Sequence, residues 1–225
     1  MPEYGVTFGS VHSYRDWGVS WNGQSNTPPE SMRALVEVPY RNGVLDVTGA
    51  LTNKIFYKTR TLTLEFIADG NTISWPKLRS KILSDIHGRA LHVTLDSDPD
   101  FYWDAYHCEV SDFNAEEGLL SFSVECEVFP YKLKQNLTSQ TFIISDVNVS
   151  KVFSNSRMEV NPTIFNAQEV QVKFTDSSGT ISTIVMSPGT HVFDNIEFVK
   201  GDNTLIFSKV SANASVTVSY REGEL

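Results

Sequence analysis

Residues 96–100 (Asp-Ser-Asp-Pro-Asp) are the part of the sequence that most resembles a metal site. Carboxylates at alternate positions open the calcium-binding loop of EF-hand proteins, where they supply oxygen ligands to the ion. That loop needs glycine at its sixth position for a sharp turn and glutamate at its twelfth position as a bidentate ligand. These positions hold Phe101 and His107 here, so we interpret the stretch as an acidic turn without a metal.

Acid–base catalysis is the next chemistry to consider. Two carboxylates stand together at Glu116 and Glu117, and His12 lies four residues before Asp16. Neighbouring carboxylates at a hairpin tip are normally solvated, whereas glycosidases need two carboxylates that flank the scissile bond. No nucleophile or orienting third group accompanies the histidine pair, and the five histidines show no metal-ligand spacing. We therefore expect no enzymatic activity, no cofactor and no metal.

The two cysteines, Cys108 and Cys126, fall in runs that flank residues 114–118 and that together indicate one antiparallel hairpin. If Val110 pairs with Val124, the cysteines also pair and share a face, because side chains alternate along each strand. We predict two buried, reduced thiols that behave as small apolar side chains. A disulfide is the alternative, although the expected reducing compartment disfavours it.

The charge of the chain excludes several kinds of partner. Its 18 lysine and arginine residues are outnumbered by 27 aspartate and glutamate residues, which gives a formal net charge of −9. Stable nucleic-acid binding is not expected, because neither half has the basic patch that phosphate binding requires. The acidic surface would instead suit a wall past which DNA slides. We expect synthesis in the cytoplasm and no membrane association, because the sequence has no signal-peptide pattern and no apolar run of about 20 residues.

Strands are predicted for most of the first half. Residues 34–39, the turn signal at Asn42-Gly43 and residues 45–48 predict a β-hairpin. Apolar and polar side chains alternate over residues 55–67, which predicts a longer strand. The polar stretch at residues 22–31 contains two prolines and predicts a loop.

One helix is predicted after this strand, starting at Ser74 and ending before Gly88. Its apolar residues recur at spacings of three and four and form one stripe. The stripe consists of Trp75, Leu78, Ile82 and Ile86. We expect it to pack on a β-sheet, with a partner-binding face as the alternative.

The second half predicts a small β-sandwich without helices. Short runs rich in β-branched or alternating residues recur at near-even spacing, separated by asparagine, serine, aspartate and glycine. Strands are expected at 158–165, 169–175, 180–186, 190–199, 203–210 and 214–221. The sequence thus predicts a mainly β protein with two domains, residues 1–133 and 134–225.

Short motifs in a fixed order add a resemblance to a known family. They are Tyr4–Gly9, Val38-Pro39 with residues 42–48, Tyr57–Arg60, His87-Gly88-Arg89, residues 98–103, Pro130–Lys132, Pro162-x-Ile164, Gly201-x-Asn203-x-Leu205 and Tyr220-Arg221. As an ordered set they resemble the distal tail (Dit) proteins of siphophages and of prophages of Gram-positive bacteria, over nearly the whole chain. The sequence departs from the family at Tyr40, where glycine is expected, and at residues 104–106 (Asp-Ala-Tyr), where Gly-Arg is common.

The resemblance implies an architecture and a set of partners. The N-terminal domain would contain a β-sandwich, one helix and an extended hairpin, and the C-terminal domain would be a galectin-like β-sandwich. Six copies would close into a ring at the tail tip of the virion, joining the tail tube protein to the tail-associated, lysozyme-like hub protein, with DNA passing through the lumen. The C-terminal domain would face outward and dock other tip proteins, including a receptor-binding protein.

A closed ring requires a heterologous subunit interface, and exposed hairpin edges are suited to pairing with a neighbour. We therefore expect the hairpin within residues 34–60 and the start of the chain to form this interface, with an ordinary internal hairpin as the alternative. The expected interface residues are Tyr4, Val6, Phe8, Val36, Val38, Asn42, Gly43, Leu45, Tyr57 and Arg60.

The competing function is recognition of host cell-wall sugars by the C-terminal sandwich. Sugar sites usually present exposed tryptophan or tyrosine rings as stacking platforms. The four tryptophans all lie in the first half, and residues 134–225 contain a single tyrosine, Tyr220. The sequence therefore favours a structural adaptor over a sugar-binding protein.

Overall fold

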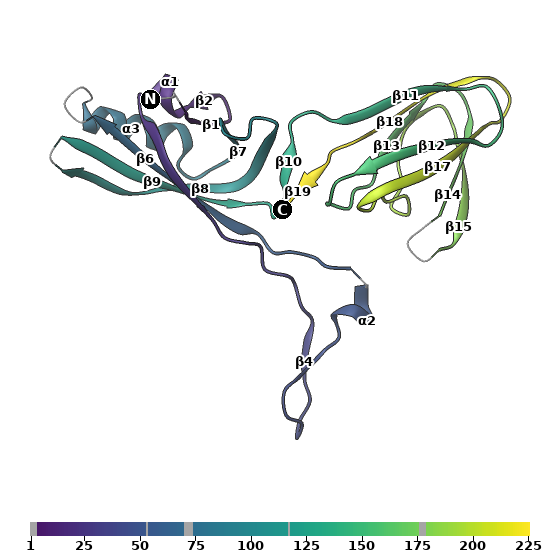
Figure 1. Ribbon diagram of the computed structural model, residues 1–225, viewed down its shortest axis with the longest axis horizontal. Coiled ribbons are helices and arrows are strands. Elements are labelled where there is room, and N and C mark those ends of the chain that lie inside the picture. The colour runs from purple at the N-terminus through teal and green to yellow at the C-terminus, as the bar shows by residue number, and fades with distance from the viewer. Residues whose placement is uncertain (1–3, 53, 70–73, 117, 176–178) are drawn as a thin grey trace. The chain divides into compact units, whose positions relative to one another are not determined.

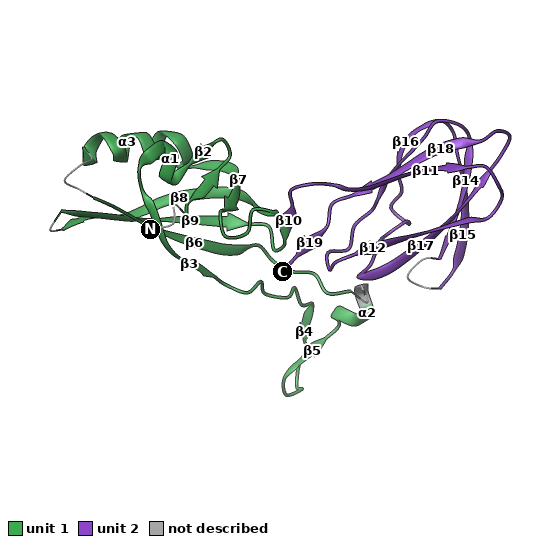
Figure 2. Cartoon of the chain, turned by 45° about the horizontal axis from the view of Figure 1, so that its top comes forward, with its two compact units in different colours: residues 1–132, 225 green, residues 133–224 purple. Residues whose placement is uncertain are grey.

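The computed structural model describes residues 4–52, 54–69, 74–116, 118–175 and 179–225. The chain forms two compact units, which Figure 2 shows in different colours. Unit 1 comprises residues 1–132 and Leu225, and unit 2 comprises residues 133–224. Strands predominate in both units, which confirms the mainly β prediction. Within the described ranges, no helix is long and apolar enough to cross a membrane.

Unit 1 is built on an antiparallel sheet with the strand order β2-β1-β7-β8-β9-β6-β3 (Figure 1). The strands are β1 (Val6–Phe8), β2 (Val11–His12), β3 (Ser20–Asn26), β6 (Arg60–Asp69), β7 (Arg89–Leu95), β8 (Phe101–Glu116) and β9 (Leu119–Val128). Three strands separate β1 from β6, yet the rings of Phe8 and Phe66 lie 6.1 Å apart. The sheet therefore folds over on itself around a shared core, as a sandwich-like N-terminal domain requires.

The hairpin of β8 and β9 has the predicted register. Val110 pairs with Val124 and Cys108 with Cys126. Both cysteines are fully buried free thiols, and their sulfur atoms lie 2.9 Å apart. The hydrogen bond from Cys126 lowers the pKa of the Cys108 thiol. The same contact, together with burial, raises the pKa of Cys126.

The predicted helix is present as α3 (Trp75–Ile86). Leu78, Ile82 and Ile86 are buried in the core of unit 1, which confirms that the apolar stripe packs inward. Gly88 follows the helix with a φ of 73°, the left-handed conformation expected at that end. Ser74 precedes the helix as predicted, but its hydroxyl makes no capping hydrogen bond.

Two short helices and the strands β2 and β3 of unit 1 were not predicted. Helix α1 (Ser13–Trp17) begins where the His12 ring accepts backbone hydrogen bonds, and α2 (Thr48–Thr52) lies beyond the predicted hairpin. Helices of five residues are too short for a periodic apolar signal. The prediction of a loop over residues 22–31 was wrong for its first part, because β3 pairs with β6 at the edge of the sheet. An edge strand tolerates polar side chains, since one side of it remains in water.

Unit 2 is a β-sandwich of two four-stranded antiparallel sheets, β11-β18-β13-β16 and β12-β17-β14-β15. The strands are β11 (Thr138–Ile144), β12 (Val149–Asn155), β13 (Thr163–Asn166), β14 (Val170–Thr175), β15 (Ile181–Met186), β16 (Gly189–Val192), β17 (Gly201–Lys209) and β18 (Ala214–Tyr220), with the short β10 (Lys132–Lys134) and β19 (Gly223–Glu224) near the ends of the unit. Phe142 of one sheet and Phe207 of the other have ring centroids 5.2 Å apart inside the core. The described part of unit 2 contains no helix, in line with the sequence, although β12 lies outside the strands that the sequence predicted.

Candidate functional site

A long two-stranded arm, residues 27–59, leaves the sheet of unit 1 between β3 and β6 (Figure 1). Its two runs are joined by hydrogen bonds from the Lys58 amide to the Glu30 carbonyl (2.9 Å) and from the Met32 amide to the Phe56 carbonyl (2.7 Å). Beyond them, β4 (Leu35–Glu37) and β5 (Val44–Asp46) form a separate two-stranded sheet. The predicted hairpin is thus the outer part of this arm.

The arm exposes many apolar side chains and lacks a core of its own. Every residue of β4 and β5 is exposed. Among the side chains of the arm that the structure describes, nine large apolar ones are more than a third exposed. They are Met32, Leu35, Val36, Val38, Tyr40, Val44, Leu45, Ile55 and Phe56. An isolated two-stranded hairpin is at best marginally stable in water, so this surface calls for a partner.

A polar network holds the base of the hairpin. The Asp46 carboxylate accepts two hydrogen bonds from the Arg33 guanidinium, at 2.7 and 3.1 Å. It also accepts the hydroxyl and amide hydrogen bonds of Thr48, at 2.6 and 3.0 Å, and that hydroxyl accepts the Ala34 amide. The hydrogen bonds from Thr48 and then from Arg33 lower the pKa of Asp46 to about 2. The carboxylate is therefore charged at neutral pH and fixes the hairpin to the start of α2.

The tip of the arm carries a tyrosine in an unusual backbone conformation. Tyr40 has a φ of 65° and a completely exposed side chain. Left-handed backbone is unfavourable for residues with a side chain and is normal for glycine. The left-handed backbone at this position therefore explains why the family resemblance predicts glycine here. Gly43, the second residue of the predicted turn signal, is also left-handed, with a φ of 80°.

The structure divides the predicted interface residues into two groups. Most of them lie on the arm or remain accessible at the start of the chain. These are Tyr4, Val36, Val38, Asn42, Gly43 and Leu45, with Tyr57 half-buried against Tyr131. Val6 and Phe8 are completely buried in the core, because their side chains alternate with that of Thr7 and point to the inner face of the sheet. Their side chains therefore cannot contact a neighbouring subunit.

Arg60, the last predicted interface residue, is also buried, with 7% of its surface exposed. Its guanidinium lies 4.2 Å from the centre of the Trp103 ring. Among the described residues, Nε and Nη2 have no hydrogen-bond partner. Burial lowers the pKa of this arginine. Arg60 thus belongs to the interior of unit 1 and drops out of the expected interface.

Met32, Ile55 and Phe56 also belong to the arm surface, although they were not among the predicted interface residues. The last two were assigned to a strand over residues 55–67, but β6 begins only at Arg60. Apolar side chains next to an alternating run look like its continuation, so the sequence offers no signal that separates them from core positions.

The acidic and histidine residues considered for chemistry serve structural contacts. Asp98 binds the Lys132 ammonium at 2.7 Å. The ring of His12 contacts Asp96 at 3.0 Å, whereas the nearby Asp16 carboxylate accepts only the His12 backbone amide. Across the described ranges, no group of three or more metal-ligating side chains is present. Glu117 lies outside those ranges, so the carboxylate pair at the hairpin tip has no structural description.

Comparison with known proteins identifies the fold. No protein-family profile matches the sequence, and no curated protein matches it. A structural comparison places the chain in the class of Dit-like phage tail folds. One matching crystal structure is that of the SPP1 Dit protein (gp 19.1), described as a paradigm of the hub adsorption apparatus in phages that infect Gram-positive bacteria. The TM-score is 0.64 over 97% of this chain and 98% of that chain, at 11% sequence identity, and this likeness shows the fold.

Proposed function

We propose that this protein is a structural component of a phage tail tip and that it acts by self-association, without catalysis. The observation that carries the proposal is the arm, which presents nine exposed apolar side chains on a hairpin without a core. A partner that covers these side chains would supply the missing core. The Dit fold favours a second copy of the chain as that partner.

In the proposed assembly, the arm of one subunit packs on unit 1 of the next and six copies close into a ring. Subunits joined by a heterologous contact of this kind form a closed ring when the rotation between neighbours is a whole-number fraction of a full turn. The ring would join the tail tube protein to the hub protein, with unit 2 available to further tip proteins such as a receptor-binding protein. A net charge of −9 suits a lumen through which DNA passes without adhering.

The structure offers little support for the competing function, sugar recognition by unit 2. Tyr220, the single tyrosine of residues 134–225, is 3% exposed and its hydroxyl donates a hydrogen bond to the Ser154 carbonyl. It is therefore a core residue and cannot serve as a stacking platform.

The test is to measure the mass of the purified chain over a range of concentrations and to image the particles by negative-stain electron microscopy. Rings of six subunits with an open centre would support the proposal. A chain that stays monomeric at every concentration, or particles that contact each other through unit 2 alone, would refute it. A variant that lacks residues 32–56 provides the control, because it removes most of the arm, including β4 and β5, and leaves the strands of the main sheet of unit 1 intact.

A further inference from the structure

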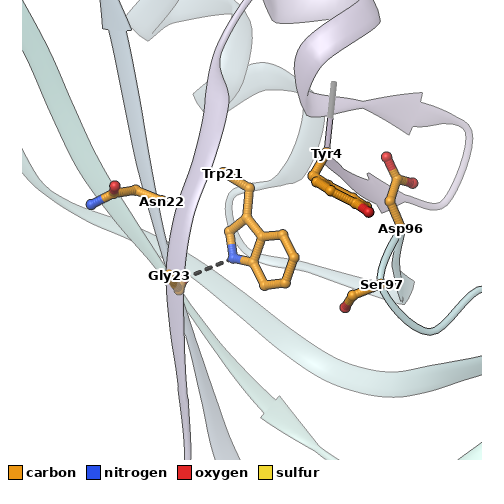
Figure 3. Close-up of a pocket in the computed structure, with 6 residues that line it drawn as sticks. All are labelled: Tyr4, Trp21, Asn22, Gly23, Asp96 and Ser97. Atoms are coloured by element: carbon orange, nitrogen blue, oxygen red, sulfur yellow. Dashed lines mark hydrogen bonds between the residues drawn. The ribbon is translucent and has the colours of Figure 1, made fainter. Parts of the chain in front are cut away.

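Unit 1 contains a surface pocket of about 440 Å³ that the proposed ring does not explain. Figure 3 shows its lining: Tyr4, Trp21, Asn22, Gly23, Asp96 and Ser97. Trp21 and its neighbours belong to the edge strand β3, whereas Asp96 and Ser97 follow the end of β7. The pocket thus brings two aromatic rings and one carboxylate together from three separate parts of the chain.

The indole ring of Trp21 offers its face to a ligand and not its hydrogen-bonding group. The indole Nε1 of Trp21 donates to the Gly23 carbonyl at 2.8 Å, so this donor is already used. Tyr4 is about half exposed and stands beside Trp21 in Figure 3. The π-face of an aromatic ring is negative and attracts cations.

The carboxylate of Asp96 keeps its negative charge although it contacts a histidine. Its Oδ2 accepts the Gly5 amide at 2.8 Å and the Nε2–H of His12 at 3.0 Å. The other ring nitrogen of His12, Nδ1, accepts the amides of Tyr14 and Arg15, both at 3.2 Å. An accepting Nδ1 places the single ring proton on Nε2, so the imidazole is neutral and does not cancel the charge of Asp96.

Close backbone packing holds this carboxylate in position. A Cβ atom at Gly5 would lie 2.4 Å from Cε1 of His12, so only glycine allows the chain to pass here. The amide of Asp96 donates to the Gly5 carbonyl at 3.1 Å, which ties the turn to the start of the chain a second time. Asp96 is therefore anchored through Oδ2, and within the described ranges Oδ1 makes no hydrogen bond.

We propose that this pocket binds an organic cation, that is, an ammonium or guanidinium group. The side chains that line it supply two π-faces, one carboxylate and the acceptor oxygens of Tyr4, Asn22 and Ser97, but no positive charge. The carboxylate and the π-faces are negative, so the lining suits a positively charged ligand. A neutral saccharide gains nothing from this charge, although the hydroxyls of Tyr4 and Ser97 and the side-chain amide of Asn22 can donate hydrogen bonds to it. The cation could be the side chain of a lysine or arginine on another protein, or a free small molecule.

The test titrates the full-length, isotope-labelled chain with n-butylammonium and follows the indole resonance of Trp21 by NMR, assigned with Trp21→Phe. An acetylated and amidated peptide Gly-Gly-Lys-Gly-Gly is the second probe, and glucose and N-acetylglucosamine are the third. Both cationic probes are expected to shift the Trp21 resonance in a saturable way. Tighter binding of the peptide would identify a protein side chain as the source, and equal affinities would identify a free cation.

Three variants make the test specific. Asp96→Asn keeps an oxygen that accepts from Gly5 and His12 but removes the charge, so binding should weaken at least about fivefold. Tyr4→Leu removes one π-face and should weaken binding about threefold. Tyr106→Ala is the control, because Tyr106 is 48% exposed, close to the 51% of Tyr4, and lies outside the pocket.

The proposal fails if neither cation shifts the Trp21 resonance, if only the saccharides do, or if Asp96→Asn binds like the wild type while remaining folded. These outcomes do not depend on ring formation, because the titration works on a monomer. Failure of this inference is therefore distinguishable from failure of the proposed function.

Discussion

Replacing Ile55 by serine tests the role of the arm directly. Ile55 exposes 68% of its surface. Complete burial of an isoleucine side chain contributes about 1.5–3 kcal/mol, so covering this exposed part contributes about 1–2 kcal/mol at each subunit contact. The dissociation constant of one contact should therefore rise roughly tenfold in Ile55→Ser. A closed ring of six repeats this loss at each contact, for about 6–12 kcal/mol in total.

The assay is sedimentation velocity over a concentration series, with the unfolding free energy measured in parallel. Ile143→Ser is a matched control, because Ile143 is also 68% exposed but lies in β11 of unit 2. We expect Ile55→Ser to shift assembly to much higher concentration without loss of stability, and Ile143→Ser to assemble like the wild type. Equal assembly of the wild type and Ile55→Ser, or equal defects in the two variants, would refute the reasoning.

Three further predictions concern the arm and the core of unit 1. The contacts of Asp46 hold the hairpin while the carboxylate is ionised, and its pKa is lowered from 3.8 to about 2. Their contribution to the stability of the hairpin is therefore complete above pH 4 and is lost as the pH falls towards 2. Amide hydrogen exchange at Thr48 should accelerate over this window, and Asp46→Asn should show fast exchange already at neutral pH. Left-handed backbone costs a residue with a side chain about 1–2 kcal/mol, and Tyr40 has this conformation. The Arg41 amide, which donates to the Val38 carbonyl, reports on the stability of this turn. Hydrogen exchange of that amide should slow in Tyr40→Gly and accelerate in Tyr40→Val. Arg60→Met removes a buried guanidinium that is incompletely hydrogen-bonded and keeps much of the side-chain volume. The free energy of unfolding in urea should therefore stay level or rise. A fall of more than about 1 kcal/mol would show that the contact with the Trp103 ring outweighs the cost of burying the charge.

The parts of the fold that the sequence predicted are those whose signal is local. The helix over residues 75–86 has a regular apolar stripe, and the register of Cys108 with Cys126 follows from alternation along two strands joined by a short turn. The hairpin of β4 and β5 was also predicted from adjacent residues, but the loop that joins its strands spans residues 38–43 and is not a two-residue turn at Asn42-Gly43. In these cases, the residues that determine the structure lie within one element or one hairpin.

The parts that the sequence did not predict depend on contacts between distant residues. His12 meets Asp96 across 84 residues, although Asp16 is the nearer acid in the sequence. Val6 and Phe8 were expected at an edge, but the order of strands in the sheet places β1 between β2 and β7. Neither the topology of a sheet nor the burial that it causes is encoded in local spacing.

The likeness to the SPP1 Dit protein extends over nearly the whole chain at 11% identity and shows the fold. The arm of this chain requires little specific sequence. Its apolar side chains need only be apolar and exposed, whereas its geometry is set locally by the Arg33–Asp46–Thr48 network and by left-handed residues at the tip. A hairpin that is already ordered before it meets its partner loses less conformational entropy on association. The arm can therefore lack a core in the free chain and still form a specific contact.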